Sequence, residues 1–304
     1  MRESDNKKLF KYLGWSFGLA WAMQIIAWRI AVSVGAGKSV ALPTITQPIV
    51  TAMMFVPLLA MILSGIKVKE IGWKPKVKGN VGTLLFSWFS PAILSVLGVG
   101  LYFLIFPGHL DLTGAALVEM SGPEAMEQMT QQGVTFPMYL AFSIVSLITT
   151  VPVINAFLSV GEEAGWRGYL YPVLKEKFGQ TKGRIIGGII WGMWHWPLIV
   201  LMGFKYGADY FGAPFLGLPV FCISLTCLGI LCDYVYEKTE CIWYPSIIHG
   251  GLNAAASIAL VMASSKTASA RLLGPSVHGL IAGLPIMICA ILLLIRSQRK
   301  ETLK

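Results

Sequence analysis

The sequence predicts an all-α, polytopic membrane protein with about eight transmembrane helices, which form a bundle around an internal polar cavity. Of its 304 residues, 55% are hydrophobic and only 13% are charged, a composition typical of membrane proteins. Apolar runs of roughly 20 residues, long enough to cross a bilayer, alternate with short basic connections. Ionisable residues also stand inside several of these runs. We therefore expect a single integral-membrane domain over residues 1–304.

The apolar runs satisfy the length criterion for spanning helices. Each is about 20 residues long and is bounded by polar or turn-forming residues. The first run follows a basic start but is too long for a cleavable signal peptide, so we expect it to remain as a span. The eight predicted spans are Tyr12–Val34, Gln47–Ile66, Val81–Phe106, Pro137–Val160 with its continuation, Ile185–Met202, Pro214–Tyr236, Ile242–Ala263 and Val277–Ile295.

The basic residues predict the orientation of the bundle. Most of the 24 Lys and Arg residues lie at the two termini and in alternate connections, whereas the other connections hold only Lys38, Lys205, Lys266 and Arg271. Cytoplasmic loops carry such an excess, so both termini are predicted to be cytoplasmic. The net charge of +9 is thus a topology signal, and no nucleic-acid partner is expected. We expect a multi-pass protein of a bacterial or archaeal cell membrane.

Several polar residues outside the main motifs receive structural interpretations. The acidic connection 107–136 is either a short amphipathic helix on the membrane surface or a solvated loop. Asp233 is expected to cap or pair near the end of the sixth span, and His278 to be exposed or interfacial on the outer side. The five cysteines contain no CxxC pair, so neither a disulfide framework nor a zinc knuckle is indicated.

The segment VGEEAGWRGYL, at residues 160–170, places two carboxylates and an arginine in an apolar run. Charges in hydrocarbon are costly unless they are paired or line a wet cavity. On a helix, Glu163 and Arg167 are an i,i+4 pair, which predicts that Arg167 fixes Glu163. Glu162 lies about 100° around the helix and is free to act as a general base. The alternative is a structural ion pair between helices.

Two later runs carry further candidates. His195 is followed by Pro197, which removes a helical hydrogen bond and predicts a bent or open helix beside the histidine. The alternative is a neutral histidine buried among tryptophans. His249 and Asn253 share a helix face, and Gly250 with Gly251 predicts close approach of neighbouring helices.

The three motifs lie at similar depths. Helical rise places Glu162, His195 and His249 on the order of 14–20 Å from the basic connections. Independent polar residues rarely agree in depth, so we interpret them as one catalytic site.

The patterns EExxxR at Glu162–Arg167, aromatic-xxx-His at Trp191–His195 and HxxxN at His249–Asn253 resemble the CAAX protease and bacteriocin-processing family of intramembrane endopeptidases. The resemblance implies a catalytic core at about residues 137–263. It implies that Glu162 and His195 activate a water molecule, and that His249 and Asn253 hold the oxyanion. Glu163, Arg167 and Trp191 are expected to support them. Trp191 stands where the family more often has Phe, which puts the cavity shape in question.

The same residues permit a metal ion. Glu162, His195 and His249, with a water molecule, make a plausible catalytic zinc site. The chain has no HExxH motif, and Asn253 is a better oxyanion donor than zinc ligand. We therefore expect no cofactor, with zinc as the alternative.

The substrate is predicted to be a peptide or protein that is lipid-anchored or inserted in the bilayer. The resemblance leaves open whether it is a prenylated CAAX peptide or a bacteriocin. A rival hypothesis is a non-enzymatic transporter or a bacteriocin self-immunity protein that uses the same ionisable groups. Many transporters carry matching polar segments in two halves, and the first half of this chain has none.

Overall fold

The computed structural model describes residues 3–302, and the regular elements in this part of the chain are helices, as the sequence predicts. They are α1 (Glu3–Ser33), α2 (Gln47–Met53), α3 (Val56–Leu63), α4 (Val81–Ile105), α5 (Ala115–Ser121), α6 (Pro123–Gln131), α7 (Phe136–Ile148), α8 (Val151–Gly165), α9 (Tyr171–Phe178), α10 (Gln180–Trp194), α11 (Trp196–Met202), α12 (Gly217–Thr239), α13 (Trp243–Val261) and α14 (Leu284–Thr302). A π-helical turn, Trp166–Leu170, joins α8 to α9.

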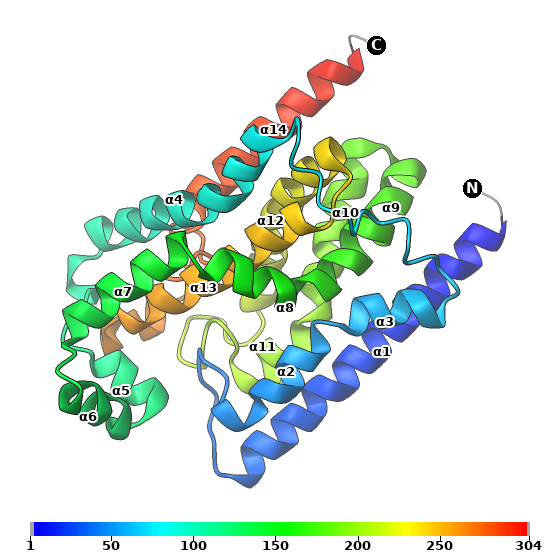
Figure 1. The fold of residues 1–304 in the computed structure, drawn as a ribbon. Helices are drawn as coiled ribbons and strands as arrows, with labels where there is room; N and C mark the ends of the chain where they lie inside the picture. Colours follow the sequence, from blue (N-terminus) through cyan, green and yellow to red (C-terminus); the bar gives the residue numbers. More distant parts are fainter. Residues whose placement is uncertain (1–2, 303–304) are drawn as a thin grey trace.

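The helices form a bundle with α8, α10, α12 and α13 in its middle (Figure 1). On one flank α1 runs beside α2 and α3, and on the opposite flank α4 lies beside α14. The helices α5 and α6 lie at the end of the bundle away from the chain termini, both of which lie toward its other end.

Five helical segments are long and apolar enough to cross a membrane: Asn6–Ser33, Thr44–Leu63, Val81–Ile105, Gln180–Met202 and Gly217–Thr239. A sixth crossing is present if Phe136–Ile148 and Val151–Phe178, which meet at 62°, form one broken span. The last two predicted spans correspond to α13, which carries polar motif residues, and to α14, whose apolar part is the shorter Leu284–Gln298. The predicted count of eight is therefore not confirmed.

Prolines explain where the predicted spans are broken. The helices α3, α8, α9 and α11 each carry a proline in their first turn: Pro57, Pro152, Pro172 and Pro197. Proline has no N–H to donate to the preceding turn but fits the start of a helix, so Pro57, Pro152 and Pro197 each begin a new helix after a break. At Pro172 the chain stays helical through the π-helical turn. The break that Pro197 predicts is present, because α10 ends at Trp194 and α11 begins at Trp196.

The small residues of α13 allow the predicted close packing. A Cβ at Gly250 would lie 2.6 Å from Cβ of Asn155 on α8, and a Cβ at Gly251 would lie 2.8 Å from Cβ of Pro91 on α4. Asn155 Nδ2 uses the close approach to donate a hydrogen bond to the Gly250 carbonyl oxygen over 3.1 Å. The helix that carries the HxxxN motif is therefore held between α8 and α4.

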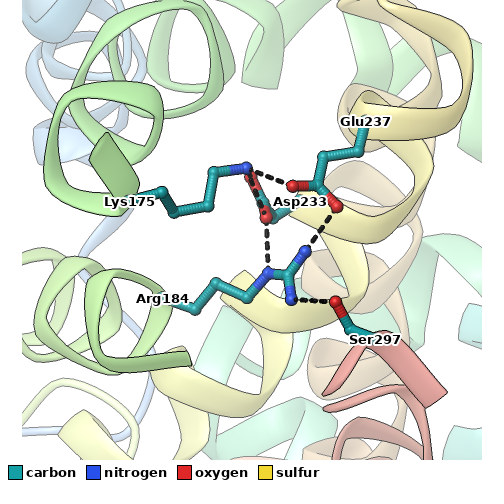
Figure 2. Close-up of polar contacts among 5 residues, drawn as sticks. All are labelled: Lys175, Arg184, Asp233, Glu237 and Ser297. Atoms are coloured by element: carbon teal, nitrogen blue, oxygen red, sulfur yellow. Dashed lines mark hydrogen bonds and ion pairs between the residues drawn. The ribbon is translucent and has the colours of Figure 1, made fainter. Parts of the chain in front are cut away.

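A buried ion-pair network joins α9, α10, α12 and α14 (Figure 2). Lys175 Nζ lies 2.8 Å from Asp233 Oδ1 and 2.7 Å from Glu237 Oε1. Arg184 Nε lies 2.6 Å from Asp233 Oδ2, its Nη2 pairs with Glu237, and its Nη1 donates to Ser297 Oγ over 3.0 Å. Two cations and two anions balance each other, and the predicted pairing of Asp233 is confirmed.

The connection 107–136 folds into α5 and α6, which agrees with the helical alternative rather than a plain loop. Leu117 of α5 is buried in a small apolar cluster with Phe136, Leu140 and Val261, which belong to α7 and α13. The amphipathic face of this connection therefore packs on the bundle itself.

Candidate active site

A cavity of about 240 Å³ lies where α8, α10, α12 and α13 meet. Five of the predicted site residues line it: Glu162, Trp191, His195, His249 and Asn253. The structure thus brings together side chains from three separate motifs. The other two, Glu163 and Arg167, lie behind the cavity wall and are fully buried.

Glu162 is held by two indole groups. Its Oε2 accepts a hydrogen bond from Trp191 Nε1 over 2.7 Å and a longer one from Trp166 Nε1 over 3.3 Å. Both bonds end on the same oxygen and fix the position of the carboxylate. The second oxygen, Oε1, makes no hydrogen bond within the described part of the chain. It is the acceptor that remains for a ligand or a water molecule.

Glu163 connects Arg167 to the histidine of the third motif. Arg167 Nη1 lies 3.1 Å from both Glu163 oxygens, so the predicted i,i+4 pair is present. The Arg167 guanidinium also lies between two rings, 4.4 Å from the Trp191 centroid and 4.6 Å from that of Tyr171. The Glu163 Oε1 atom is also 2.8 Å from His249 Nδ1. The sequence did not reveal this last contact, which joins the first motif to the third.

His195 lies at the break between α10 and α11. Its Nδ1 is 3.0 Å from the carbonyl oxygen of Trp191. Because a carbonyl oxygen only accepts hydrogen bonds, Nδ1 carries the proton, and a neutral His195 keeps an unprotonated Nε2. At the break Leu198 N donates to His195 O over 3.1 Å instead of to Trp194 O. Gln24 of α1 binds both separated groups: its Nε2 donates to Trp194 O over 2.8 Å, and its Oε1 accepts from Leu198 N over 3.1 Å.

His249 and Asn253 lie one helical turn apart on α13 and face the cavity together. The Glu163 carboxylate accepts the hydrogen of His249 Nδ1, which fixes the orientation of the imidazole ring. The ring also packs edge-on against Trp191, with 5.1 Å between centroids. The cavity therefore has one restrained imidazole and one primary amide on the wall formed by α13.

The comparisons with known proteins agree with these motifs. The family model described as Type II CAAX prenyl endopeptidase Rce1-like matches residues 140–255, which include all seven predicted site residues. The protein named CAAX prenyl protease 2 from Methanococcus maripaludis is 43% identical over 51 residues, which are 16% of this chain and 19% of that relative. The aligned part is thus about a fifth of the relative's length. Residues 140–255 are thus similar to the family that the three motifs resemble.

Two further residues line the cavity that carries the family's motifs. His278 is 4% exposed and faces the same cavity as His195, so the expectation that it is exposed or interfacial is wrong. The reason is that α14 begins only at Leu284, and the irregular chain before it turns into the bundle. Lys205, counted among the outer-loop cations in the sequence, also lines the cavity. Neither position stands in a motif or a helical periodicity.

Gln24 was also missed. It is a polar residue in the first apolar run and is 1% exposed, and an intramembrane polar residue of this kind is itself a signal of a structural or functional contact.

The cavity does not present a ready metal site. Within residues 3–302, no three His, Cys, Asp or Glu side chains come close enough together to share one metal ion. Glu162, His195 and His249 line one cavity, but as placed they are not grouped closely enough to form a three-ligand zinc site.

Proposed function

We propose that the chain is an intramembrane endopeptidase of the CAAX-processing type, which hydrolyses a peptide bond near the C-terminus of a lipid-anchored substrate. The observation that supports this most is the convergence of Glu162, His195, His249 and Asn253, from three motifs, on one cavity of about 240 Å³. The family description and the named function of the relative supply the substrate class.

The nucleophile in this proposal is a water molecule between Glu162 and His195. Glu162 Oε1 accepts one proton as the water attacks the scissile carbonyl carbon, and the unprotonated Nε2 of His195 accepts a hydrogen bond from the other. The two indole donors keep Oε2 in place and direct Oε1 to the water. Glu162 then gives its proton to the leaving amine, which restores the carboxylate.

The developing oxyanion is held by α13. Asn253 Nδ2 donates one hydrogen bond, and His249 donates a second from Nε2 when its ring is protonated on both nitrogens. The Glu163 carboxylate contacts His249 Nδ1 at 2.8 Å and holds the ring in position. Donors aimed at developing charge in a dry site typically contribute 10²–10³-fold in rate each.

The test uses the purified chain in detergent and a fluorogenic peptide that carries a prenylated cysteine near a free C-terminus. Glu162→Gln keeps the size of the side chain but removes the base, so kcat should fall by at least about 10²-fold, the usual contribution of a general base. The matched control is Glu176→Gln, which removes an exposed carboxylate on α9. An inactive wild type, or a Glu162→Gln variant with unchanged kcat, would contradict the proposal.

The same assay distinguishes a water-activating glutamate from a metal ion. Prolonged dialysis against a zinc chelator should leave kcat unchanged if Glu162 acts without a metal. Loss of activity that added zinc restores would instead favour the zinc-dependent form of the reaction.

A further inference from the structure

Lys205 is a buried cation without a carboxylate partner. It lies between α11 and α12, is 9% exposed and lines the cavity that Glu162 lines. Within the described residues its Nζ has no carboxylate within ion-pair distance, and the one contact found for it is the Phe204 ring, with 4.6 Å from Nζ to the centroid. The other buried cations, Arg167, Lys175 and Arg184, all pair with carboxylates.

The cavity has no spare anion to neutralise Lys205. Glu162 is the one carboxylate among its lining residues, and its Oε2 is already held by the indole groups of Trp166 and Trp191. Burial lowers the pKa of Lys205 to about 8, so its ammonium group is still mostly protonated at neutral pH. An uncompensated positive charge that is buried is costly, and an anionic ligand would reduce that cost.

His278 supplies a second donor at the same wall. Its Nδ1 lies 2.9 Å from Ser224 Oγ, and its backbone oxygen accepts a hydrogen bond from Tyr206 OH over 3.0 Å. The other ring nitrogen, Nε2, is buried and has no partner within the described residues. Burial holds the pKa of His278 well below its usual range, so the ring is neutral. When Ser224 donates to Nδ1, Nε2 carries the hydrogen and needs an acceptor.

We propose that Lys205 and His278 bind the α-carboxylate at the C-terminus of the peptide substrate. This inference rests on the proposed endopeptidase function, since a peptide cut near its end brings one obligatory carboxylate into the cavity. Lys205 and Glu162 line one cavity, and three extended residues span at most about 10 Å, so a carboxylate held at Lys205 would keep the last peptide bonds of the substrate inside the cavity that contains Glu162. The carboxylate site would then select the bond to be cut by its distance from the C-terminus.

The inference is tested with two peptides that differ only in ending as a free acid or a carboxamide. The wild type should cleave the acid with a kcat/KM on the order of tenfold to hundredfold higher, the usual value of a hydrogen bond to a charged group. In Lys205→Met this ratio should fall to near one, and in Lys205→Arg it should be largely kept. The control Lys38→Met removes an exposed cation from the predicted outer side and should keep the wild-type ratio.

The pH dependence provides an independent readout. The KM for the acid should rise as the pH passes about 8, because Lys205 then loses its proton. The other titratable groups that line the cavity, Glu162, His195, His249 and His278, face both peptides. The ratio of the two KM values therefore isolates Lys205.

Binding to the Glu162→Gln variant makes the test independent of cleavage. The acid should bind at least about tenfold more tightly than the carboxamide, and adding Lys205→Met should remove the difference. Cleavage of both peptides with equal kcat/KM would overturn the inference and leave the endopeptidase function standing. Binding and cleavage of neither peptide would overturn both. A carboxamide that ends in Glu and behaves like the acid would assign the site to side-chain carboxylates and also overturn the inference.

Discussion

The Glu163 carboxylate contacts two groups with different roles, the Arg167 guanidinium and the His249 imidazole. The contact with Arg167 compensates a buried charge, whereas the contact with His249 orients a ring at the cavity. The two glutamates of the first motif are therefore divided by their surroundings. Glu162 faces the cavity, and Glu163 supports the groups around it.

The Glu163→Gln variant should lose more stability than chemistry. Its neutral amide leaves Arg167 as a buried, unpaired charge, and breaking a buried ion pair in this way typically costs about 3–5 kcal/mol. We expect a lower unfolding temperature in detergent and a smaller fall in kcat, per folded molecule, than Glu162→Gln shows. Adding Arg167→Met removes the orphaned charge and should recover part of the stability. A Glu163→Gln protein that unfolds at the wild-type temperature yet is as inactive as Glu162→Gln would refute this division.

At the scale of elements, the site depends on broken helices being held in register. Gln24 binds both ends of the break beside His195, and the Asp233 network joins α9, α10, α12 and α14. These contacts satisfy groups that the breaks and the buried charges would otherwise leave without partners. The elements around the cavity are thereby fixed relative to one another at both ends of α10.

The Asp233→Asn variant tests this network. It leaves Lys175 and Arg184 with Glu237 alone, so two buried cations share one carboxylate, and we expect a loss on the order of 3 kcal/mol. Thermal unfolding in detergent measures the change. Glu70→Gln is the matched control, since its pair with Lys67 is exposed on both sides and should contribute little. Equal melting temperatures for the two variants would show that the network does not stabilise the bundle.

At the scale of the whole molecule, the features that could be predicted from the sequence are those set by residue spacing within one helix. The Glu163–Arg167 pair follows from helical geometry, and the break at His195 follows from Pro197. The inward turn of the chain at His278 and the position of Lys205 depend on packing between segments far apart in the sequence. Charge counts place Lys205 in an outer loop, because they cannot show that its side chain reaches back into the bundle.

The number of crossings is the main feature of the whole molecule that length and composition leave undecided, and it depends on the broken pair α7 and α8 and on α13. With the broken pair counted as one crossing, Lys266 lies on the opposite side from Lys78 if α13 crosses the membrane. If α13 does not cross, the two lie on one side. Both side chains are exposed, and the five native cysteines are buried or partly buried, so single cysteines at these positions can be labelled against a low background.

In intact cells an impermeant maleimide should label Lys266→Cys and, as a positive control, Lys38→Cys. It should label Lys78→Cys only after the membrane is permeabilised. Labelling of Lys266→Cys only after permeabilisation would mean that the helix of the HxxxN motif enters the bundle without crossing the bilayer, and would reduce the number of crossings.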